Sequence, residues 1–256
     1  MNRLVALFVA ALATLMLAGC EHPNPRELQG WVEGDMVFVS PDEQGRVEML
    51  NVREGDRVPK GKLLFTLDDD LQKADVAVRQ AALFNAQQAY NRAEELLKSA
   101  SGTRKALDDA DAALRQAKAN LEAAQTRLTR RRVLSPVVGT VQKVYFRPGE
   151  TVQPAKPVIA LLPPPNLKIR FFAPETELAQ IKIGETVRVS CDSCAKGLTA
   201  SVSFIAQSAE YTPPVIYSRE ERAKLVYLIE ARPADPDKFR VGQPVTVTLP
   251  PGGVSP

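Results

Sequence analysis

The residues best suited to metal or redox chemistry are few, because the chain has three cysteines and a single histidine, His22. Cys191 and Cys194 are separated by two residues and follow a run typical of a β-strand. A structural zinc site needs four ligands, and no second cysteine pair is present. Thiol redox motifs normally open a helix in an α/β setting, and this pair lies between predicted strands. A local disulfide that braces a turn is therefore favoured, with unpaired thiols, or redox or metal chemistry, as the alternatives.

The third cysteine, Cys20, ends a segment that has the features of an export signal. Arg3 precedes an apolar run over residues 4–18, which is shorter than the roughly 20 residues that span a bilayer but suits a signal-peptide core. The stretch Leu17-Ala18-Gly19-Cys20 resembles the lipobox of bacterial lipoproteins. That resemblance implies cleavage of residues 1–19 and attachment of lipid to Cys20, and a plain secretory signal is the alternative. Export to an oxidising periplasm also favours the disulfide.

Residues 20–29 are polar and contain two prolines, so we expect a lipidated tether. Such a tether would hold the protein at the periplasmic face of a bacterial membrane. The inner membrane is favoured, although Glu21, directly after the lipidated cysteine, leaves the choice of membrane open.

Composition excludes several classes of protein. With 45% hydrophobic and 25% charged residues, the chain is typical of folded protein and not of collagen-like or wholly disordered sequences. The net charge of +3 gives no reason to expect nucleic acid as a partner.

An internal repeat predicts a small β-domain. Residues 45–67 align without gaps with residues 139–161, at a shift of 94, and seven of the 23 positions are identical. Each copy has short strand-like runs separated by Gly-Asp or Gly-Glu turns. One copy has too few strands for a core, so we expect the two copies to pack together. A duplicated barrel of another kind is the alternative.

The residues between the two copies, 68–132, predict two long helices. In the first, apolar residues recur at spacings of three and four, and we expect them to face the second helix: Leu71, Ala74, Val78, Ala82, Ala86, Ala89, Ala93 and Leu96. A break follows at residues 99–102, and Thr103 is a candidate N-cap. In the second, leucines lie seven residues apart, at Leu107, Leu114, Leu121 and Leu128. This spacing is typical of a coiled coil, and because both ends must return to one β-domain, we expect an antiparallel hairpin.

Residues 163–250 predict a small β-barrel, with strands expected over 167–172, 186–190, 198–205, 225–231 and 245–249. Residues 251–256 form a short tail. No cluster of catalytic residues, phosphate-binding loop or metal-ligand set is evident, so we expect a protein that is not an enzyme.

Together these features resemble the periplasmic adaptors, or membrane fusion proteins, of the HlyD-like superfamily. The resemblance implies an elongated multidomain α+β protein. A split lipoyl-like sandwich (residues 30–67 and 133–162) carries an inserted coiled-coil hairpin, and a barrel follows. It further implies a ring of identical subunits that couples an inner-membrane exporter to an outer-membrane channel.

Family adaptors contact the channel through an arginine, a leucine four residues later and a serine seven residues after that. The corresponding residues here are Arg92, Leu96 and Thr103, with threonine in place of serine. The alternative roles are a solvated arginine, a leucine within the coiled-coil seam and a helix cap.

Residues 212–218, with sequence TPPVIYS, resemble the subgroup that serves ABC-type exporters, as do residues 225–227 and 230–232. The resemblance suggests a permease contact by Thr212, Pro213, Pro214 and Tyr217, although a proline-stiffened loop would look the same.

Two other functions stay open: a lipoyl-like carrier or enzyme scaffold, and an adaptor-shaped envelope lipoprotein without a pump. True lipoyl carriers modify a lysine in the turn between the half-motifs, and the helical insertion occupies that place here. We therefore expect no covalent cofactor. No residue of the sequence indicates the chemistry of the transported substrate.

Overall fold

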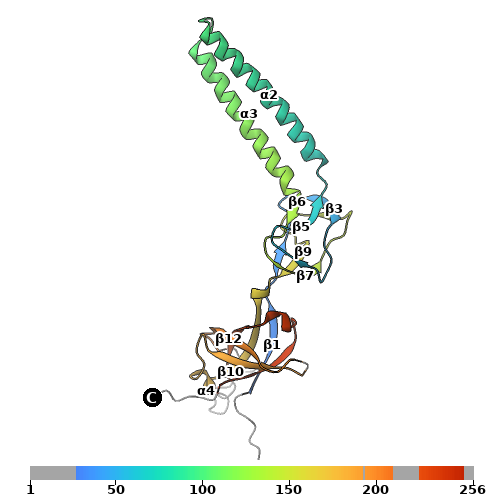
Figure 1. Cartoon of the computed structure of the whole chain (residues 1–256), viewed down its shortest axis with the longest axis vertical. Helices are drawn as coiled ribbons and strands as arrows, with labels where there is room; N and C mark the ends of the chain where they lie inside the picture. The colour runs from blue at the N-terminus through green and yellow to red at the C-terminus, as the bar shows by residue number, and fades with distance from the viewer. Residues whose placement is uncertain (1–26, 193, 210–224, 251–256) are drawn as a thin grey trace, which may run out of the picture. The chain divides into compact units, whose positions relative to one another are not determined.

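The computed structural model describes residues 27–192, 194–209 and 225–250. They fold as two compact units. The first is Gly34–Asn166, and in the second residues 27–33 join residues 167–250. The first unit contains a small β-domain and a helical hairpin, and the second contains a closed β-barrel (Figure 1).

The β-domain of the first unit is a sandwich of two four-stranded sheets, ordered β2-β9-β7-β4 and β6-β5-β3-β8. The strands are β2 (Val37–Val39), β3 (Gly45–Leu50), β4 (Arg57–Val58), β5 (Leu63–Leu67), β6 (Arg132–Leu134), β7 (Gly139–Val144), β8 (Thr151–Val152) and β9 (Ile159–Leu162). Strands β3 to β5 belong to the first copy of the repeat and β7 to β9 to the second. Each sheet therefore combines strands from both copies, and the 3₁₀ turn η2 (Pro164–Asn166) ends the unit.

The two copies of the repeat exchange backbone hydrogen bonds in a symmetric way. The Gly55 amide donates to the Val141 carbonyl at 2.8 Å, and the Gly149 amide donates to the Val47 carbonyl at 2.7 Å. These four residues are related by the same shift of 94 that aligns the sequences. Strand β4 pairs with β7 and β8 pairs with β3, so each copy supplies an edge strand to the other. Neither copy is complete alone.

Both glycines sit in turns that require a left-handed backbone. Their φ angles are +91° at Gly55 and +95° at Gly149, a region that residues with a side chain rarely adopt. The following acidic side chains close the turns, since Asp56 accepts from the Arg53 amide and Glu150 accepts from the Arg147 amide, both at 2.9 Å. The repeat thus preserves the turn chemistry as well as the strands.

The core of the sandwich is a single cluster drawn from both copies. Equivalent positions are buried to the same extent: each is at most 1% exposed in the pairs Val47 and Val141, Val58 and Val152, and Leu64 and Val158. This arrangement confirms that the copies share one core, because the buried residues of both belong to the same cluster.

The insertion is an antiparallel hairpin of α2 (Asp70–Lys98) and α3 (Arg104–Arg130) (Figure 1). At 1.5 Å per residue each helix is about 40 Å long. The hairpin leaves from β5 and returns into β6, and these strands pair with Thr66 opposite Arg132. Thr103 caps α3 as expected, since its hydroxyl oxygen accepts from the Ala106 amide at 3.1 Å.

The seam between the helices confirms the prediction for α3 and corrects the one for α2. The four leucines of α3 are half-buried, and Ala124 is 2% exposed. On α2, however, the half-buried residues seven apart are Val76, Leu83, Tyr90 and Leu97.

The predicted contacts of Leu71, Val78 and Leu96 are wrong, because these side chains are 82%, 64% and 51% exposed. Helix α2 carries two apolar stripes, and only one of them can face α3. Of the predicted alanines, Ala86, Ala89 and Ala93 are half-buried, whereas Ala74 and Ala82 are exposed, so the α2 prediction holds only in part.

The second unit is a closed barrel with the strand order β1-β10-β13-β12-β11-β14. The strands are β1 (Glu27–Gly34), β10 (Leu167–Pro174), β11 (Thr186–Ser190), β12 (Leu198–Ile205), β13 (Val226–Pro233) and β14 (Pro244–Thr248). A short helix, α4 (Glu175–Leu178), follows β10, and a 3₁₀ turn, η4 (Pro236–Lys238), precedes β14. The five strands predicted beyond residue 163 are therefore present, with ends shifted by a few residues.

Strand β1 was not predicted, and it changes the expected division of the chain. Residues 27–29 do not belong to a tether, because β1 pairs with β14 and places Leu28 and Val32 in the barrel core, where they are 7% and 0% exposed. Conversely, residues 163–166 lie in the first unit. The barrel needs this strand because it closes the gap between β14 and β10.

Candidate partner-binding site

The described residues offer no metal centre. Within residues 27–192, 194–209 and 225–250, no three His, Cys, Asp or Glu side chains are placed to hold a metal ion. No helix in that part of the chain is long and apolar enough to cross a membrane. The hairpin presents exposed groups at its tip.

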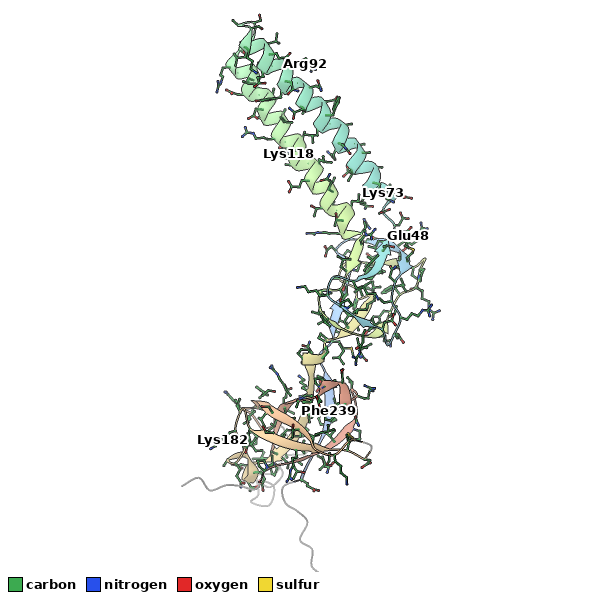
Figure 2. The ribbon with its side chains drawn as sticks, in the orientation of Figure 1. Glu48, Lys73, Arg92, Lys118, Lys182 and Phe239 are labelled. Atoms are coloured by element: carbon green, nitrogen blue, oxygen red, sulfur yellow. A yellow bond between two sulfur atoms is a disulfide. The ribbon has the colours of Figure 1, made fainter. Side chains whose placement is uncertain are left out.

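Arg92 lies on α2 near the hairpin tip (Figure 2). Leu96 follows it four residues later in the same helix, so the two side chains lie on one face. Leu96 is 51% exposed, and its neighbour Leu97 takes the place in the seam. The interpretation of Leu96 as a seam residue is therefore wrong. Of the described ion pairs, none includes Arg92, so its guanidinium is available to a partner.

The tip between the helices is tight. The Ser101 amide donates to the Leu96 carbonyl at 2.9 Å, and the Ser99 amide donates to the Glu95 carbonyl at 3.0 Å. A Cβ on Gly102 would come within 2.9 Å of the Leu97 backbone nitrogen, which explains the glycine. Because the turn is short, Thr103 follows Leu96 by only seven residues. Since the Thr103 hydroxyl accepts the capping bond, its own hydrogen stays available for donation.

Arg131 holds the hairpin base to the sandwich. Its side chain is 9% exposed and donates to the Gln44 carbonyl at 2.9 Å and to the Glu43 carboxylate at 3.1 Å. In the amide orientation that satisfies both groups, the Gln72 side-chain oxygen on α2 also accepts from the guanidinium. The backbone carbonyl of Arg131 accepts a hydrogen bond from the Leu67 amide, at the end of β5, at 2.9 Å. One residue therefore joins the exit of β5, the start of α2 and the end of α3, a contact that the helical periodicity did not reveal.

Ion pairs surround this base. Arg46 contacts Asp68 at 2.7 Å and Arg130 contacts Asp42 at 3.2 Å. The hydrogen bond from Arg46, followed by that from the Asp70 amide, lowers the pKa of the Asp68 carboxyl below its ordinary value. The salt bridge therefore persists at any pH above the ordinary pKa of aspartate and is lost only as the pH falls further. Because both side chains are exposed, we expect orientation of the hairpin to be its main effect.

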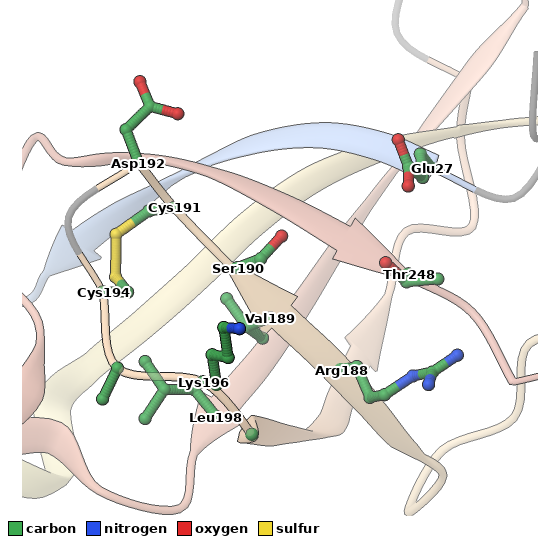
Figure 3. Close-up of a pocket in the computed structure, with 12 residues that line it drawn as sticks. Glu27, Arg188, Val189, Ser190, Cys191, Asp192, Cys194, Lys196, Leu198 and Thr248 are labelled. Carbon is green, nitrogen blue, oxygen red and sulfur yellow. A yellow bond between two sulfur atoms is a disulfide. The ribbon is translucent and has the colours of Figure 1, made fainter.

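In the barrel, Cys191 and Cys194 form a disulfide across the turn that follows β11, with the Cα atoms 5.1 Å apart (Figure 3). The Gln243 side-chain amide lies 2.9 Å from the Cys191 sulfur and ties this turn to the start of β14. A shallow groove of about 550 Å³ lies beside it, with Arg188 and Lys196 among its lining residues. Its charged lining residues also include Glu27 and Asp192.

Some predicted residues lie outside the described part of the chain. They are the lipidated Cys20, the leader over residues 1–19, and the permease-contact residues Thr212, Pro213, Pro214 and Tyr217.

The fold and its hairpin correspond to a known family. The family model described as "RND MFP, barrel-sandwich hybrid domain" matches residues 35–162, half of the chain and nearly all of the first unit. The chain belongs to the membrane fusion protein family.

Individual proteins support the assignment. A UPF0194 membrane protein from Acidithiobacillus ferridurans is 29% identical over 96% of this chain and 94% of its own length. Among solved structures, the membrane fusion protein Spr0693 from Streptococcus pneumoniae has a TM-score of 0.68 at 20% identity, covering 87% of this chain and 98% of its own. A MacA-MexA chimeric protein with the Pseudomonas aeruginosa MexA α-hairpin has a TM-score of 0.68 at 24% identity, covering 88% and 81%. At these identities the structures show the shared fold. Membrane fusion proteins are non-enzymatic adaptors of the cell envelope that work with inner-membrane transporters and outer-membrane channels.

Replacement of Arg131 should loosen the hairpin base. We expect Arg131→Ala to lower the free energy of unfolding by about 1–3 kcal/mol, because the buried guanidinium and its hydrogen bonds to Glu43, Gln44 and Gln72 are lost. Urea denaturation measures this change. The matched control is Arg132→Ala, at an exposed neighbour, which should change stability by at most about 0.5 kcal/mol. Equal effects of the two substitutions would contradict the role given to Arg131.

The cysteine pair should be resistant to alkylation. In denaturant without reductant, peptides that contain residues 191–194 should carry no alkyl group by mass spectrometry, and two after reduction. The variant Cys191→Ser should leave Cys194 alkylated without reduction. Ready double labelling of the unreduced native protein would refute the disulfide.

Proposed function

We propose that this membrane fusion protein is the periplasmic adaptor of a tripartite efflux or secretion system, coupling an inner-membrane exporter of the ABC class to an outer-membrane channel. The observation that carries the proposal is a hairpin with both ends fixed to one sandwich and with Leu96 exposed at its tip. A hairpin held at its base is suited to reach a partner and to transmit displacement.

The tip supplies complementary chemistry for a helical channel. Arg92 can donate paired hydrogen bonds to carboxylates or carbonyls. Full burial of Leu96 would contribute about 1.5–3 kcal/mol. Thr103 adds a hydroxyl on the other side of the turn. We assign the channel contact to these three residues.

The N-terminal strand supports a position of the barrel near the membrane. Strand β1 begins at Glu27, seven residues after Cys20. Seven extended residues span at most about 25 Å. A lipid on Cys20 would therefore keep the start of β1 within that distance of the membrane surface, on the periplasmic side, with inner-membrane anchoring favoured.

The ABC assignment rests on the sequence of residues 212–218 and its flanking strand. The description of the matching family model names RND transporters, so an RND-type transporter is the alternative to an ABC-type partner. Affinity purification of the adaptor from native membranes, followed by identification of the transporter that accompanies it, separates the two classes.

The other functions receive less support. A lipoyl-like carrier would modify a lysine in the turn between the half-motifs, and α2 and α3 stand in that place. An envelope lipoprotein without a pump would need no partner-binding surface at the tip, whereas an adaptor would use the exposed Leu96 together with Arg92.

The tip assignment predicts specific cross-links in cells. A photo-reactive amino acid at position 96 or 103 should yield adducts with an outer-membrane channel protein. The same probe at Lys118, exposed midway along α3, should yield none and serves as the control. If a working pump gave no channel adducts from positions 96 and 103, or equal adducts from 118, the tip would not be the channel-binding surface.

A further inference from the structure

An exposed apolar turn lies at one end of the barrel, in the segment that joins α4 to β11. Ile183 stands at the apex of this turn and is 70% exposed. The turn is tightly held, because the Glu185 amide donates to the Lys182 carbonyl at 3.1 Å and the Lys182 amide donates to the Glu185 carboxylate at 3.0 Å. It therefore presents the isoleucine to its surroundings in a fixed conformation.

The register of the strands shows which end of the barrel carries this turn. Arg188 on β11 and Glu27 on β1 both pair with Thr248 on β14, so they are level. Both strands are antiparallel to β14 and therefore run in the same direction. Thr186, the first residue of β11, is two residues before Arg188 and so about 7 Å beyond Glu27. The turn precedes β11, so it lies beyond Glu27 on the side where the chain enters β1.

A second exposed apolar side chain lies at the same end. Phe204, near the end of β12, is 46% exposed. The Gly184 amide donates to the Val202 carbonyl at 2.8 Å, and the Val202 amide donates to the Glu185 carbonyl at 2.9 Å. The turn is thus bound to β12 just before Phe204. We call the exposed side chains of Lys182, Ile183 and Phe204 the end patch.

The lipidated tether of the proposed function would bring the end patch to a bilayer. Seven residues lead from Cys20 to Glu27 and span at most about 25 Å. Because the patch lies beyond Glu27 on the side where the tether joins the barrel, it can reach the membrane surface without a change in the barrel. The tether also keeps the patch at a high local concentration next to the lipid, so a weak contact is sufficient.

The chemistry of the end patch suits the boundary between lipid headgroups and acyl chains. Ile183 and Phe204 would bury apolar surface there, and the Lys182 amine can stay among the headgroups. Helix α4, at the same end of the barrel, adds the exposed carboxylate of Glu175 (Figure 1). Since charges of both signs are present, the contact does not require anionic lipid.

We propose that the end patch inserts Ile183 and Phe204 into the headgroup–acyl boundary of the membrane that anchors Cys20, and that it does so without a transporter. This inference rests on the anchoring in the proposed function and adds a second contact with lipid. A tether alone leaves the barrel free to rotate on its anchor. A second attachment at the end patch fixes the direction of the barrel axis.

A lipid surface fits the end patch better than a protein partner does. A stable protein interface buries about 800 Å² on each partner. Two apolar side chains and a lysine supply much less than that area. An addition to an existing lipid anchor needs less, because the anchor has already brought the two surfaces together.

Quenching by labelled lipid tests the contact. The intact protein with lipid on Cys20 is placed in phosphatidylcholine vesicles that contain no other protein and whose lipids carry a nitroxide on the acyl chain. An environment-sensitive fluorophore on Ile183→Cys should show blue-shifted emission and loss of fluorescence, relative to vesicles without nitroxide.

The chain contains a matched control at the opposite end of the barrel. The Gln243 amide donates to the Arg240 carbonyl at 3.1 Å, and the Gln243 side-chain oxygen accepts from the Arg240 amide at 3.0 Å. This is the same turn, with Val241 in the position of Ile183 and 42% exposed. It precedes β14, whose first residue pairs with β1 away from Glu27. A fluorophore on Val241→Cys should keep the emission that it has in buffer and should not be quenched.

A fixed probe separates the effect of the patch from that of the fluorophore. With the fluorophore on Gln180→Cys, at an exposed position between α4 and the turn, Ile183→Asp should remove most of the quenching, because a carboxylate is costly among acyl chains. Ile183→Leu should preserve it. Circular dichroism should show the same β-structure in both variants.

The outcomes separate this inference from the proposed function. No quenching at position 183 of the lipidated protein, or equal quenching at positions 183 and 241, would overturn the lipid contact and leave the adaptor role intact. A blue shift at 183 that requires a transporter in the membrane would make the transporter the occupant. Mass spectra without lipid on Cys20 would also overturn the inference, because the tether brings the patch to the bilayer. Capture of the channel from positions 96 and 103 reports on the adaptor role independently.

Discussion

The structure depends on the exchange of backbone hydrogen bonds between two copies of one short repeat. Gly55 donates to the second copy and Gly149 donates back to the first, and each copy lends an edge strand to the other. Because neither copy buries its core alone, the residues before and after the insertion must meet in one body. That requirement brings the ends of α2 and α3 together and makes the insertion a hairpin. The position of the hairpin therefore depends on the two glycine turns that join the copies.

The base of the hairpin is held by buried contacts, whereas its tip is exposed, and this difference suits the role of an adaptor. At the base, Arg131 contacts the sandwich and α2 from a buried position, and ion pairs such as that of Arg46 with Asp68 surround it. At the tip, Leu96 and Arg92 have no comparable contacts in the described part of the chain. Fixed attachment at one end and exposed contacts at the other are what a component that bridges two partners requires.

Sequence alone predicted the repeat, the hairpin and most of the barrel because their signals are local. Glycine at a left-handed turn, leucine every seventh residue and Thr103 at a helix start each have one structural explanation. The errors came from features that local patterns do not decide. Leu96 and Leu97 are adjacent, so periodicity could not tell which one faces α3. Strand β1 pairs with β14, more than 200 residues away, and only the closed barrel shows why Leu28 and Val32 are buried. The contacts of Arg131 likewise depend on segments that are distant in sequence.

Native-state hydrogen exchange at the amides of Val47, Gly55, Val141 and Gly149 tests the shared body most directly. If the copies depend on each other, all four amides should exchange through one opening reaction with the same free energy, and Gly55→Val should raise the exchange rate of the Gly149 amide as much as that of Val141. Rapid exchange at the two amides of one copy while the other two stay protected would show that the copies fold separately, and the hairpin would lose its common base.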